Sequence, residues 1–391
     1  MVAVTLIVLG LLIYLLVDSI GSAPPPSDNA QSDASPTSGE TVIHLAFGGD
    51  INVTNKVIEA GYTGDGYQYK DIFKDVLPAL AGADHTVVNF EGSLCGPPYG
   101  GTETRAPQEL ADALSSAGVD MLQMANSYSI NNGMIGLEQT LSNIRSAGME
   151  PLGAYASAEE ADETGGFVLR SIHGVKVAFV AFTKGMDNMS LPEGMEHCVN
   201  VLYKDYTSTY QTVDTAGITR VLENVAAAQP DITIALLHWG SEFNSQVSSS
   251  QKRIVSLMKQ NGVDAIIGTH SHYVQEIEYD EQNGTLVAYS LGDLLGNADR
   301  SRTAYSVILN LEVTRNNETA ETKVTGFEYT PVFIDNRETE DGDLTTRLRR
   351  IPQAIEEYEA NGIEMVSPEA YEAMKSALTR LEKLFAPKEE E

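Results

Sequence analysis

The sequence predicts a mixed α/β fold with two sheets at its centre and helices around them. Two patterns carry this prediction. In the first, a helix-like stretch ends at glycine and leads into a short apolar run that closes with polar residues. In the second, long strand-like segments are joined by short polar turns. The first pattern is typical of helix-to-strand units and the second of antiparallel hairpins, so together they indicate a core of mixed sheets.

The chain opens with an uncharged apolar run from Met1 to Val17, which Asp18 follows. A membrane-spanning helix needs about 20 mostly apolar residues and the core of a signal peptide about 7 to 15, so the run lies between the two. No basic residue precedes it and no clear cleavage site follows it. We expect residues 1–20 to form an uncleaved membrane anchor, with a cleaved signal segment as the first alternative and a buried core helix as the second.

Residues 21–41 are rich in proline, serine, glycine and aspartate and contain almost no apolar side chains. This composition is typical of a flexible linker. An anchor followed by a linker predicts an extracytoplasmic domain held at the cell membrane, or a secreted protein if the first segment is cleaved.

The folded domain is predicted over residues 42–335. Glycine after a helix supplies the left-handed residue that ends it, and the apolar run that follows suits a buried strand. Such units read LAGADHTVVNFEGS (80–93), LSSAGVDMLQMANS (114–127), IRSAGMEPLGAY (144–155) and MKQNGVDAIIGTHSH (258–272). Hairpins are predicted over residues 166–182, 274–293 and 305–334, with turns at His173-Gly174, at Asn283-Gly284 and in RNNETAET.

Beyond Asn336 the chain becomes charged, and residues 336–391 are predicted to be a C-terminal helical extension. Helices are expected over 346–362 and 367–386, because the apolar spacing there fits helices that pack one face on the body.

Polar residues with metal-binding side chains stand at the ends of five predicted strands. They are Asp50, Asn89 with Glu91, Asn126, His238, and His270 with His272. A ligand site in an open α/β sheet lies beyond the carboxyl ends of the strands, where such residues converge. Aspartate and asparagine also favour turns, so a single one only marks the start of a loop. Five strand ends with these side chains indicate a shared site.

Carboxylate, carboxamide oxygen and neutral imidazole are ligands of divalent cations such as Zn, Mn or Fe. The candidate metal ligands are Asp50, Glu91, Asn126, His238, His270 and His272. Two such cations about 3.5 to 4 Å apart can polarise a phosphoryl group and generate hydroxide, and a carboxylate can bridge them. The sequence therefore predicts one or two divalent metal ions and leaves their identity open among Mn, Zn, Fe and Mg.

The formal net charge of the chain is −30. This excludes a nucleic-acid-binding protein, because nucleic-acid phosphates require clusters of lysine and arginine. Acidity of this kind suits a soluble surface or the binding of cations. Cys95 and Cys198 are far apart and form no CxxC pattern, so they are either two free thiols or, in an exported protein, one pair.

Six sequence blocks occur in the order seen in the bacterial capsule synthesis protein CapA family, which is associated with poly-γ-glutamate. They read FGGDIN, VVNFEGSL, MANSYSINNG, LLHWGSEF, IIGTHSHYVQ and YSLGDLL and cover about residues 42 to 300. The resemblance implies a calcineurin-like metallophosphoesterase fold, a four-layer α/β/β/α sandwich. It also implies a membrane-anchored, extracytoplasmic protein that acts in synthesis, export or attachment of the capsule polymer.

The resemblance assigns roles to the strand-end residues. Asp50 matches the first metal-ligand aspartate, Glu91 stands where phosphoesterases have a bridging aspartate, and the remaining ligand positions match Asn126, His238, His270 and His272. Tyr128 replaces a histidine that assists phosphate binding or leaving-group protonation, and Asn131 stands in the place of an aspartate. Tyrosine has a pKa near 10, so it donates a hydrogen bond but is a poorer acid at neutral pH. Tyr128 and Asn131 are therefore altered catalytic positions.

Further residues are predicted to line the pocket or to support the ligands: Asn52, Asn89, Trp239, Glu242 and Asp293. Asp293 stands where the family usually has asparagine and adds a carboxylate. Trp239 either forms a wall of the site or fills the core. Glu242 either orients a histidine or is a solvated acid of the loop.

Three functions agree with the sequence. The first is a membrane-anchored CapA-like protein whose partners are an anionic capsule polymer or its precursor, the membrane, and other capsule synthesis membrane proteins. The second is an active metal-dependent phosphoesterase or amide hydrolase. The third is a non-catalytic module for polymer binding or assembly.

Overall fold

The computed structural model describes residues 39–338, 344–362 and 366–386. The predicted membrane segment and nearly all of the predicted linker lie outside these residues. In the described part of the chain, no helix is both long enough and apolar enough to cross a membrane.

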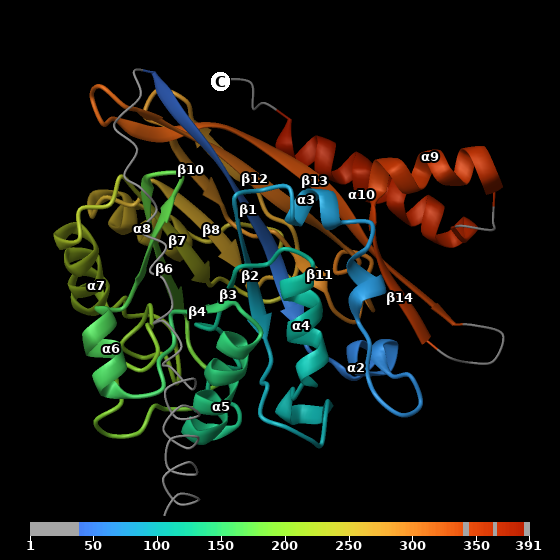
Figure 1. Ribbon diagram of the computed structural model, residues 1–391, viewed down its shortest axis with the longest axis horizontal. Helices are drawn as coiled ribbons and strands as arrows, with labels where there is room; N and C mark the ends of the chain where they lie inside the picture. The colour runs from blue at the N-terminus through green and yellow to red at the C-terminus, as the bar shows by residue number, and fades with distance from the viewer. Residues whose placement is uncertain (1–38, 339–343, 363–365, 387–391) are drawn as a thin grey trace, which may run out of the picture. The chain divides into compact units, whose positions relative to one another are not determined.

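Two sheets form the centre of the fold, as predicted (Figure 1). The first has the strand order β14-β13-β12-β1-β2-β3-β4, with β11 paired to β1. Strands β1 to β4 run parallel, whereas β12, β13 and β14 are antiparallel to their neighbours. Its strands are β1 Glu40–Asn52, β2 His85–Glu91, β3 Met121–Gln123, β4 Glu150–Leu152, β11 Asp293–Leu295, β12 Tyr305–Asn316, β13 Thr322–Glu338 and β14 Leu344–Arg350.

The second sheet has the order β5-β6-β7-β8-β10-β9. Strands β6, β7, β8 and β10 are parallel, and the edge strands β5 and β9 are antiparallel to their neighbours. These strands are β5 Val168–Ile172, β6 Val175–Thr183, β7 Ile232–His238, β8 Ala265–Thr269, β9 Ile277–Asp280 and β10 Thr285–Ala288.

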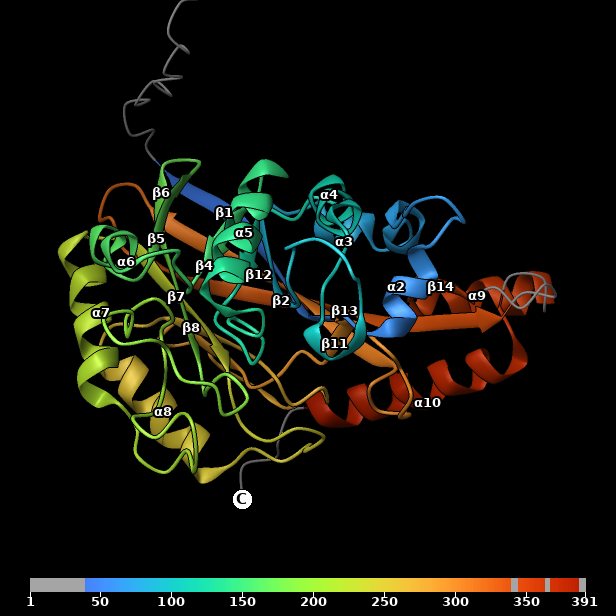
Figure 2. The same cartoon turned by 90° about the horizontal axis from the view of Figure 1, so that it is seen from below.

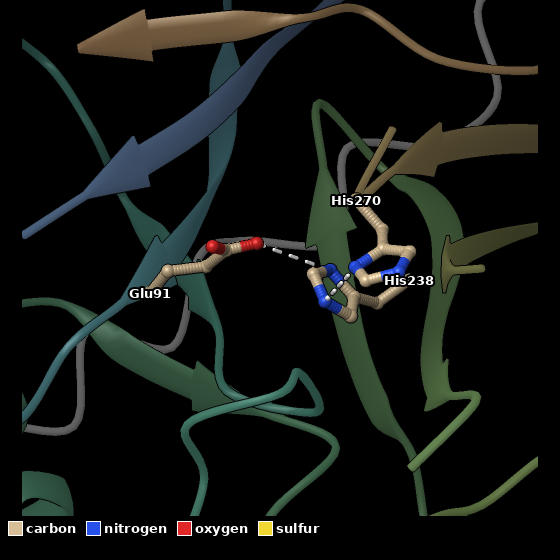
Figure 3. A group of neighbouring side chains, drawn as sticks. All are labelled: Glu91, His238 and His270. Carbon is tan, nitrogen blue, oxygen red and sulfur yellow. Dashed lines mark hydrogen bonds and ion pairs between the residues drawn. The ribbon is translucent and has the colours of Figure 1, made fainter. Parts of the chain in front are cut away.

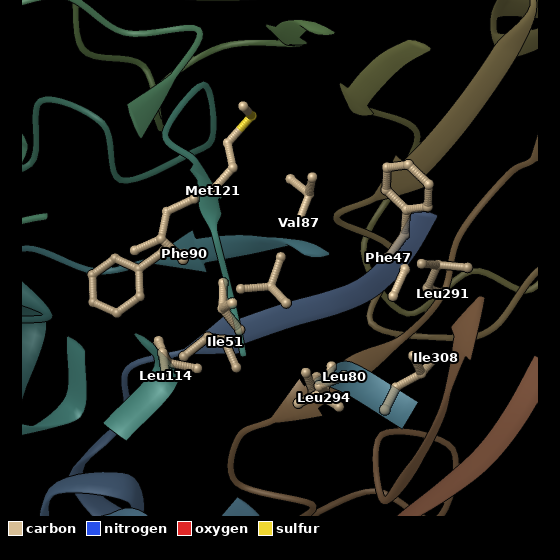
Figure 4. Packing of buried hydrophobic residues seen from close by; sticks show 14 of the residues in the cluster. Phe47, Ile51, Leu80, Val87, Phe90, Leu114, Met121, Leu291, Leu294 and Ile308 are labelled. Carbon is tan, nitrogen blue, oxygen red and sulfur yellow. The ribbon is translucent and has the colours of Figure 1, made fainter. Parts of the chain in front are cut away.

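Helices pack on both sheets (Figures 1 and 2). Apolar residues of α7 and α8, among them Ile218 and Ile254, form one buried cluster with the second sheet. A larger cluster joins the two sheets to α4 and α5. Figure 4 shows the part of this cluster where strands of the first sheet meet Leu114 of α4. The helices are α2 Asn55–Gly61, α3 Leu77–Leu80, α4 Gln108–Ser116, α5 Gly133–Ser146, α6 Ala158–Thr164, α7 Thr215–Ala227, α8 Ser249–Gln260, α9 Ile351–Asn361 and α10 Pro368–Phe385, with short 3-10 turns η1 Lys70–Phe73 and η2 Gly101–Glu103. The predicted α/β/β/α arrangement is confirmed.

The local signals in the sequence are confirmed where they concern turns. Gly118, Gly148 and Gly262 follow α4, α5 and α8 with φ of 93°, 84° and 83°, the left-handed conformation that a side chain disfavours. The predicted hairpins are β5 with β6, β9 with β10 and β12 with β13. The two cysteines are free thiols.

The prediction of a helix across residues 346–350 is wrong. These residues belong to β14, which pairs with β13, for instance Leu348 with Ile334. Thr346 and Leu348, two residues apart, are both buried, as residues on one face of a strand are. Helix α9 begins only at Ile351 and has a proline in its first turn. The predicted boundary at residue 336 therefore falls inside β13, and the C-terminal extension begins with a strand of the sheet.

Helix α10 lies beside β13 (Figure 2). It packs on the face of β13 that also contacts β9, an edge strand of the second sheet. Phe327 and Tyr329 are two residues apart in β13, so they point to one face. The ring of Phe327 lies 5.6 Å from that of Tyr279 in β9, and the ring of Tyr329 lies 4.7 Å from that of Phe385 in α10, centroid to centroid. Helix α10 therefore packs on the first sheet on the same side as the second sheet does.

Candidate metal centre

The predicted ligands come together where the carboxyl ends of strands from the two sheets face each other. Asp50 lies near the end of β1 and Glu91 ends β2 in the first sheet, while His238 ends β7 and His270 follows β8 in the second. Their side chains are buried. Parallel strands of one sheet share a carboxyl edge, and here the edges of two sheets face each other, so residues far apart in the sequence converge between them.

One group of donor atoms consists of Glu91, His238 and His270 (Figure 3). Nε2 of His238 lies 3.0 Å from Nδ1 of His270, and Nδ1 of His238 lies 3.4 Å from Oε1 of Glu91. All three side chains point toward one another across the gap between the sheets (Figure 3). A carboxylate and two imidazoles are thus presented from three different strand ends.

The second group consists of Asp50, His272 and Asp293. Nδ1 of His272 lies 2.7 Å from Oδ1 of Asp293 and 3.8 Å from Oδ2 of Asp50. Asp50 and Asp293 are neighbours because β1 pairs with β11 in parallel at these two residues. Asp293, which was predicted only to line the pocket or support the ligands, therefore lies directly in a candidate ligand group.

Asn89 and the backbone of His270 connect the two groups. Nδ2 of Asn89 donates to Oδ1 of Asp50 at 2.6 Å and to Oε1 of Glu91 at 3.2 Å. The backbone N–H of His270 donates to Oδ2 of Asp50 at 3.1 Å. Both oxygens of Asp50 therefore accept a hydrogen bond, which fixes the orientation of the carboxylate.

Asn126 braces the site. Its Nδ2 donates to the carbonyl of Phe90 at 2.7 Å and to Oδ1 of Asn89 at 3.2 Å, and its Oδ1 accepts from the N–H of Tyr128 at 2.9 Å. Both ends of the carboxamide are engaged by protein groups, so in this arrangement Asn126 positions Asn89 and the loop after β3.

The turn after β8 has an uncommon backbone. His270 and His272 have φ of 88° and 56°, in the left-handed region that residues with a side chain rarely adopt. Such conformations persist only where the surroundings hold them, and they gather at functional sites. Here the hydrogen bond from the His270 N–H to Asp50 helps to stabilise the left-handed conformation of His270.

Burial sets the charge states of the centre. It holds the pKa values of His238 and His270 well below the ordinary range, so both imidazoles are neutral and keep a lone pair for a metal. Burial also raises the pKa of Glu91 well above its usual range, with the Asp50 carboxylate adding to the effect. For His272, burial lowers the pKa, but Asp293, Glu91 and Asp50 outweigh it and raise it to about 10.

These residues fit a divalent cation. Three carboxylates, Asp50, Glu91 and Asp293, are buried within one small region and disfavour one another's charge. A cation relieves that repulsion, and neutral imidazoles beside carboxylates are the donor set that Zn, Mn and Fe prefer. A bound cation would supply Lewis acidity and a water of lowered pKa.

A cleft of about 460 Å³ lies beside the centre and is lined by Asn52, Tyr128 and Asn297, among others. Burial raises the pKa of Tyr128 to about 12, so its hydroxyl stays protonated and serves as a hydrogen-bond donor. Asn131 does not reach the centre. Its Nδ2 donates to the carbonyl of Thr102 at 2.9 Å and to Oγ1 of Thr104 at 3.3 Å, which fastens a loop.

Trp239 lies in the core and not in the wall of the site. Adjacent strand residues point to opposite faces, so His238 faces the centre and Trp239 faces the cluster with α7 and α8. Its Nε1 donates to the carbonyl of Tyr289 at 2.9 Å. Glu242 is exposed in the loop after β7 and raises the pKa values of Glu91 and Tyr128 only as a secondary cause.

Three contacts to the imidazoles have no counterpart among the predicted residues. Oγ of Ser127 lies 3.1 Å from Nε2 of His238, and Oγ1 of Thr269 lies 3.1 Å from Nδ1 of the same ring. Nζ of Lys184 lies 3.2 Å from Nε2 of His270. Each residue stands next to or just after a strand end, so the signal that identified the ligands was also present for these residues.

A family model described as bacterial capsule synthesis protein PGA_cap matches residues 44–298. The PGA biosynthesis protein CapA of Bacillus subtilis is 25% identical over 327 residues, which cover 80% of this chain and 76% of that protein. The capsule biosynthesis protein CapA of Bacillus anthracis is 24% identical over 261 residues, which cover 64% of this chain and 59% of that protein.

Two solved structures resemble the fold. A phosphatase from Mycoplasma pneumoniae aligns with a TM-score of 0.45 and 14% identity, over 75% of this chain and 94% of that one. The calcineurin-like phosphoesterase YfkN of Bacillus subtilis aligns with a TM-score of 0.41 and 14% identity, over 88% of this chain and 99% of that one.

Proposed function

Because this chain belongs to the bacterial capsule synthesis protein PGA_cap family, we propose that it acts on an anionic capsule polymer, such as poly-γ-glutamate, through a centre that binds divalent cations. The action is synthesis, export or attachment of the polymer. The name of the Bacillus subtilis relative, a PGA biosynthesis protein, supports the polymer, and the name of the Bacillus anthracis relative supports a role in capsule biosynthesis. The single observation that carries the metal is the convergence of three buried carboxylates with the neutral imidazoles of His238 and His270, beside His272, which has to lose a proton before it can bind a cation.

The negative charge of the chain explains why the proposed polymer binding requires a bound cation. A protein with a formal charge of −30 repels a polymer of glutamate. Cations held by Asp50, Glu91 and Asp293 reverse the local sign and give carboxylates of the polymer a partner. Polymer binding should therefore depend on the metal.

We expect the purified full chain, supplied with Mn, to bind poly-γ-glutamate at least about tenfold more tightly than the same protein treated with a chelator, because without the cation the three buried carboxylates repel the carboxylates of the polymer. Calorimetric titration of the polymer measures the difference, and elemental analysis of the same sample measures the metal. Equal affinity with and without chelator would contradict the bridging role of the cation.

The metal occupancy should fall at acidic pH. Burial raises the pKa of Asp50 from 3.8 to about 6, although His272 lowers it, so a cation must displace a proton below this pH. At a fixed, subsaturating Mn concentration we expect protonation of Asp50 to lower the apparent affinity about fivefold from pH 6 to pH 5, because a carboxyl with a pKa of about 6 falls from about half to about one-tenth ionised over that range. Equilibrium dialysis with elemental analysis checks this, and an affinity that stays level over this range would exclude Asp50 as the competing group.

Metal affinity falls at acidic pH, whereas the raised pKa of Asp50 makes the metal-free protein more stable there. The folded state binds the proton of Asp50 more tightly than the unfolded chain does, since its pKa is raised from 3.8 to about 6. The stabilising contribution of the protonated carboxyl is therefore present below about pH 4 and is lost as the pH rises through about 6. Bound cation offsets this loss.

We also propose that the protein is held at the outer side of the cell membrane by residues 1–20, where it meets other membrane proteins of capsule synthesis. The support is the apolar run from Met1 to Val17 and the polar stretch that follows it. Retention of the full chain in a membrane fraction, and its release when residues 1–20 are deleted, tests the anchor.

Hydrolysis of a phosphoester or an amide is the second candidate function, favoured by the cleft that lies beside the donor groups. Its residues would bind and orient a substrate there, with Tyr128 as a hydrogen-bond donor. A proton donor for the leaving group is the weak point, because burial raises the pKa of Tyr128 to about 12. This favours a centre that binds and orients the polymer over one that cleaves it.

A further inference from the structure

Two arginines stand beside the candidate metal centre, on the loop that follows β11. The guanidinium carbon of Arg300 lies 3.7 Å from the centroid of the Phe243 ring, and that of Arg302 lies 5.6 Å from the centroid of the Tyr273 ring. Both arginines are exposed. The ion pairs found within residues 39–338, 344–362 and 366–386 involve neither of them, so no carboxylate of the described chain neutralises their charge in such a pair.

Phe243 connects Arg300 to the centre. Its ring stacks on the imidazole of His272, with centroids 5.2 Å apart and planes inclined by 28°. The side chain is 37% exposed and the backbone has φ of 55°, held by a bond from its N–H to the carbonyl of Ser271 at 2.8 Å. An exposed phenylalanine in a left-handed conformation is uncommon, and such strain gathers at functional sites.

The arginine loop is anchored and borders the cleft. Asp299 pairs with Lys56, so the one acidic residue between Asp293 and Tyr305 is already neutralised. The hydroxyl oxygen of Thr303 accepts from the N–H of Arg300 at 3.3 Å, and Nδ2 of Asn336 donates to the carbonyl of Asn297 at 3.1 Å. Asn297 also lines the cleft with Tyr128. The loop thus presents two positive charges beside the buried carboxylates, in addition to the Lys184 ammonium at His270.

Stacking on an aromatic ring orients a guanidinium without using its N–H groups. The ring contacts the flat face, and the N–H donors lie in the plane and point outward. A carboxylate matches this edge with two parallel hydrogen bonds, which an ammonium group cannot form. The 3.7 Å distance of Arg300 from Phe243 fits such a contact, whereas Arg302 lies farther, at 5.6 Å, from Tyr273. Two guanidinium groups beside a metal centre suit a ligand that carries carboxylates at regular intervals.

We propose that Arg300 and Arg302 form a carboxylate-binding subsite, which holds side-chain carboxylates of the anionic polymer and so places the chain beside the metal centre. This inference rests on the proposed function and adds to it the chemical group that is recognised and the residues that recognise it. Phe243 and Tyr273 are the platforms that orient the two guanidinium groups.

The test compares two double variants of the full chain that change the net charge equally. Arg300→Gln with Arg302→Gln removes the subsite, whereas Arg253→Gln with Arg380→Gln removes two exposed arginines of α8 and α10. We expect the first pair to weaken binding of poly-γ-glutamate about tenfold, from the loss of charged hydrogen bonds in partial solvent, and the second pair to change it less than about twofold. Both should keep the metal content of the unchanged protein.

Two further measurements separate a specific subsite from general charge. Arg300→Lys with Arg302→Lys keeps the charge but loses the paired donors, so we expect most of the loss to remain. Phe243→Leu removes one platform and keeps both arginines, and should weaken binding in the same direction. Poly-γ-glutamate with esterified carboxyl groups loses its contacts to the cation and to the arginines, so it should bind the unchanged protein more weakly than the free polymer binds the Arg300→Gln, Arg302→Gln variant.

The outcomes distinguish this inference from the proposed function. If the unchanged protein holds metal and binds polymer but the two glutamine pairs behave alike, the subsite is wrong and the metal centre stands. If the protein holds metal but does not bind the polymer, the subsite and the choice of polymer are both wrong. If no metal is held under replete conditions, the proposed centre fails, and the subsite is retained only if the Arg300→Gln, Arg302→Gln loss is still measured.

Discussion

Asp50→Asn should lower the apparent affinity for divalent cation by about 100-fold or more, since loss of a metal ligand exceeds the 10- to 100-fold cost of losing a residue that only supports one. The variant replaces a buried carboxylate by a neutral group of the same shape. It also leaves one donor without an acceptor, because Asn89 and the N–H of His270 each bond a different oxygen of Asp50. Elemental analysis after dialysis against graded Mn concentrations measures the loss.

Asp264→Asn is the matched control. Burial raises the pKa of Asp264 to about 6 as well, and its Oδ2 accepts from the N–H of Thr233 at 2.8 Å. It lies just before β8, at the opposite end from His270, so the same chemical change should leave the metal content intact. Equal metal content in the two variants would remove Asp50 from the candidate ligands. Any hydrolytic turnover must also disappear with Asp50→Asn if the centre performs it.

Gly49→Ala should destabilise the protein by at least about 3 kcal/mol and abolish tight metal binding, because it forces two backbone segments apart. A Cβ at Gly49 would lie 1.8 Å from the carbonyl oxygen of Gly292. That contact is with backbone, so no side chain can move to relieve it. The same segments hold Asp50 beside Asp293, through the pairing of β1 with β11 and the bond from the Asp50 N–H to the Gly292 carbonyl at 3.0 Å.

The control for this variant is Gly326→Ala in β13 of the same sheet. There the nearest atom to an added Cβ is the Cβ of Glu312 at 4.0 Å, an ordinary contact. Gly326→Ala should therefore change the free energy of unfolding by less than about 1 kcal/mol, as substitutions in open space do. Chemical denaturation of the metal-free proteins measures stability, and elemental analysis measures the centre. If the Gly49→Ala protein had normal stability, the close contact between Gly49 and the Gly292 carbonyl would not be needed for the fold, and the prediction would be wrong.

Local patterns in the sequence were enough to identify most of the sheets. Glycine after α4, α5 and α8 ends each helix through a backbone conformation that belongs to glycine itself, so the signal needs no tertiary context. Hairpin turns are local for the same reason. The strand-end positions of Asp50 with Glu91, and of His238 with His270, followed, because parallel strands of one sheet bring their carboxyl ends to one edge. That the edges of the two sheets face each other was decided by the tertiary structure.

Residues 346–350 show where local patterns fail. A stretch rich in arginine and followed by a helix has the composition of a helix, and only the pairing of Leu348 with Ile334 makes it a strand. Trp239 shows the same limit for a single side chain. Whether it enters the site or the core depends on which face of β7 meets the opposite sheet, and a sequence gives the alternation of faces but not which face is which.

The sequence by itself thus determined most of the order of helices and strands, β14 excepted, and the residue types that stand at the strand ends, because both follow from interactions between near neighbours in the chain. The tertiary structure decided the partners: Asp293 beside Asp50, Lys184 beside His270, and Arg300 on Phe243 beside His272. These pairs join segments far apart in the sequence, and their distances are set by how two sheets pack and by which strands lie next to each other. Whether the centre binds metal and the arginine loop binds polymer depends on those distances.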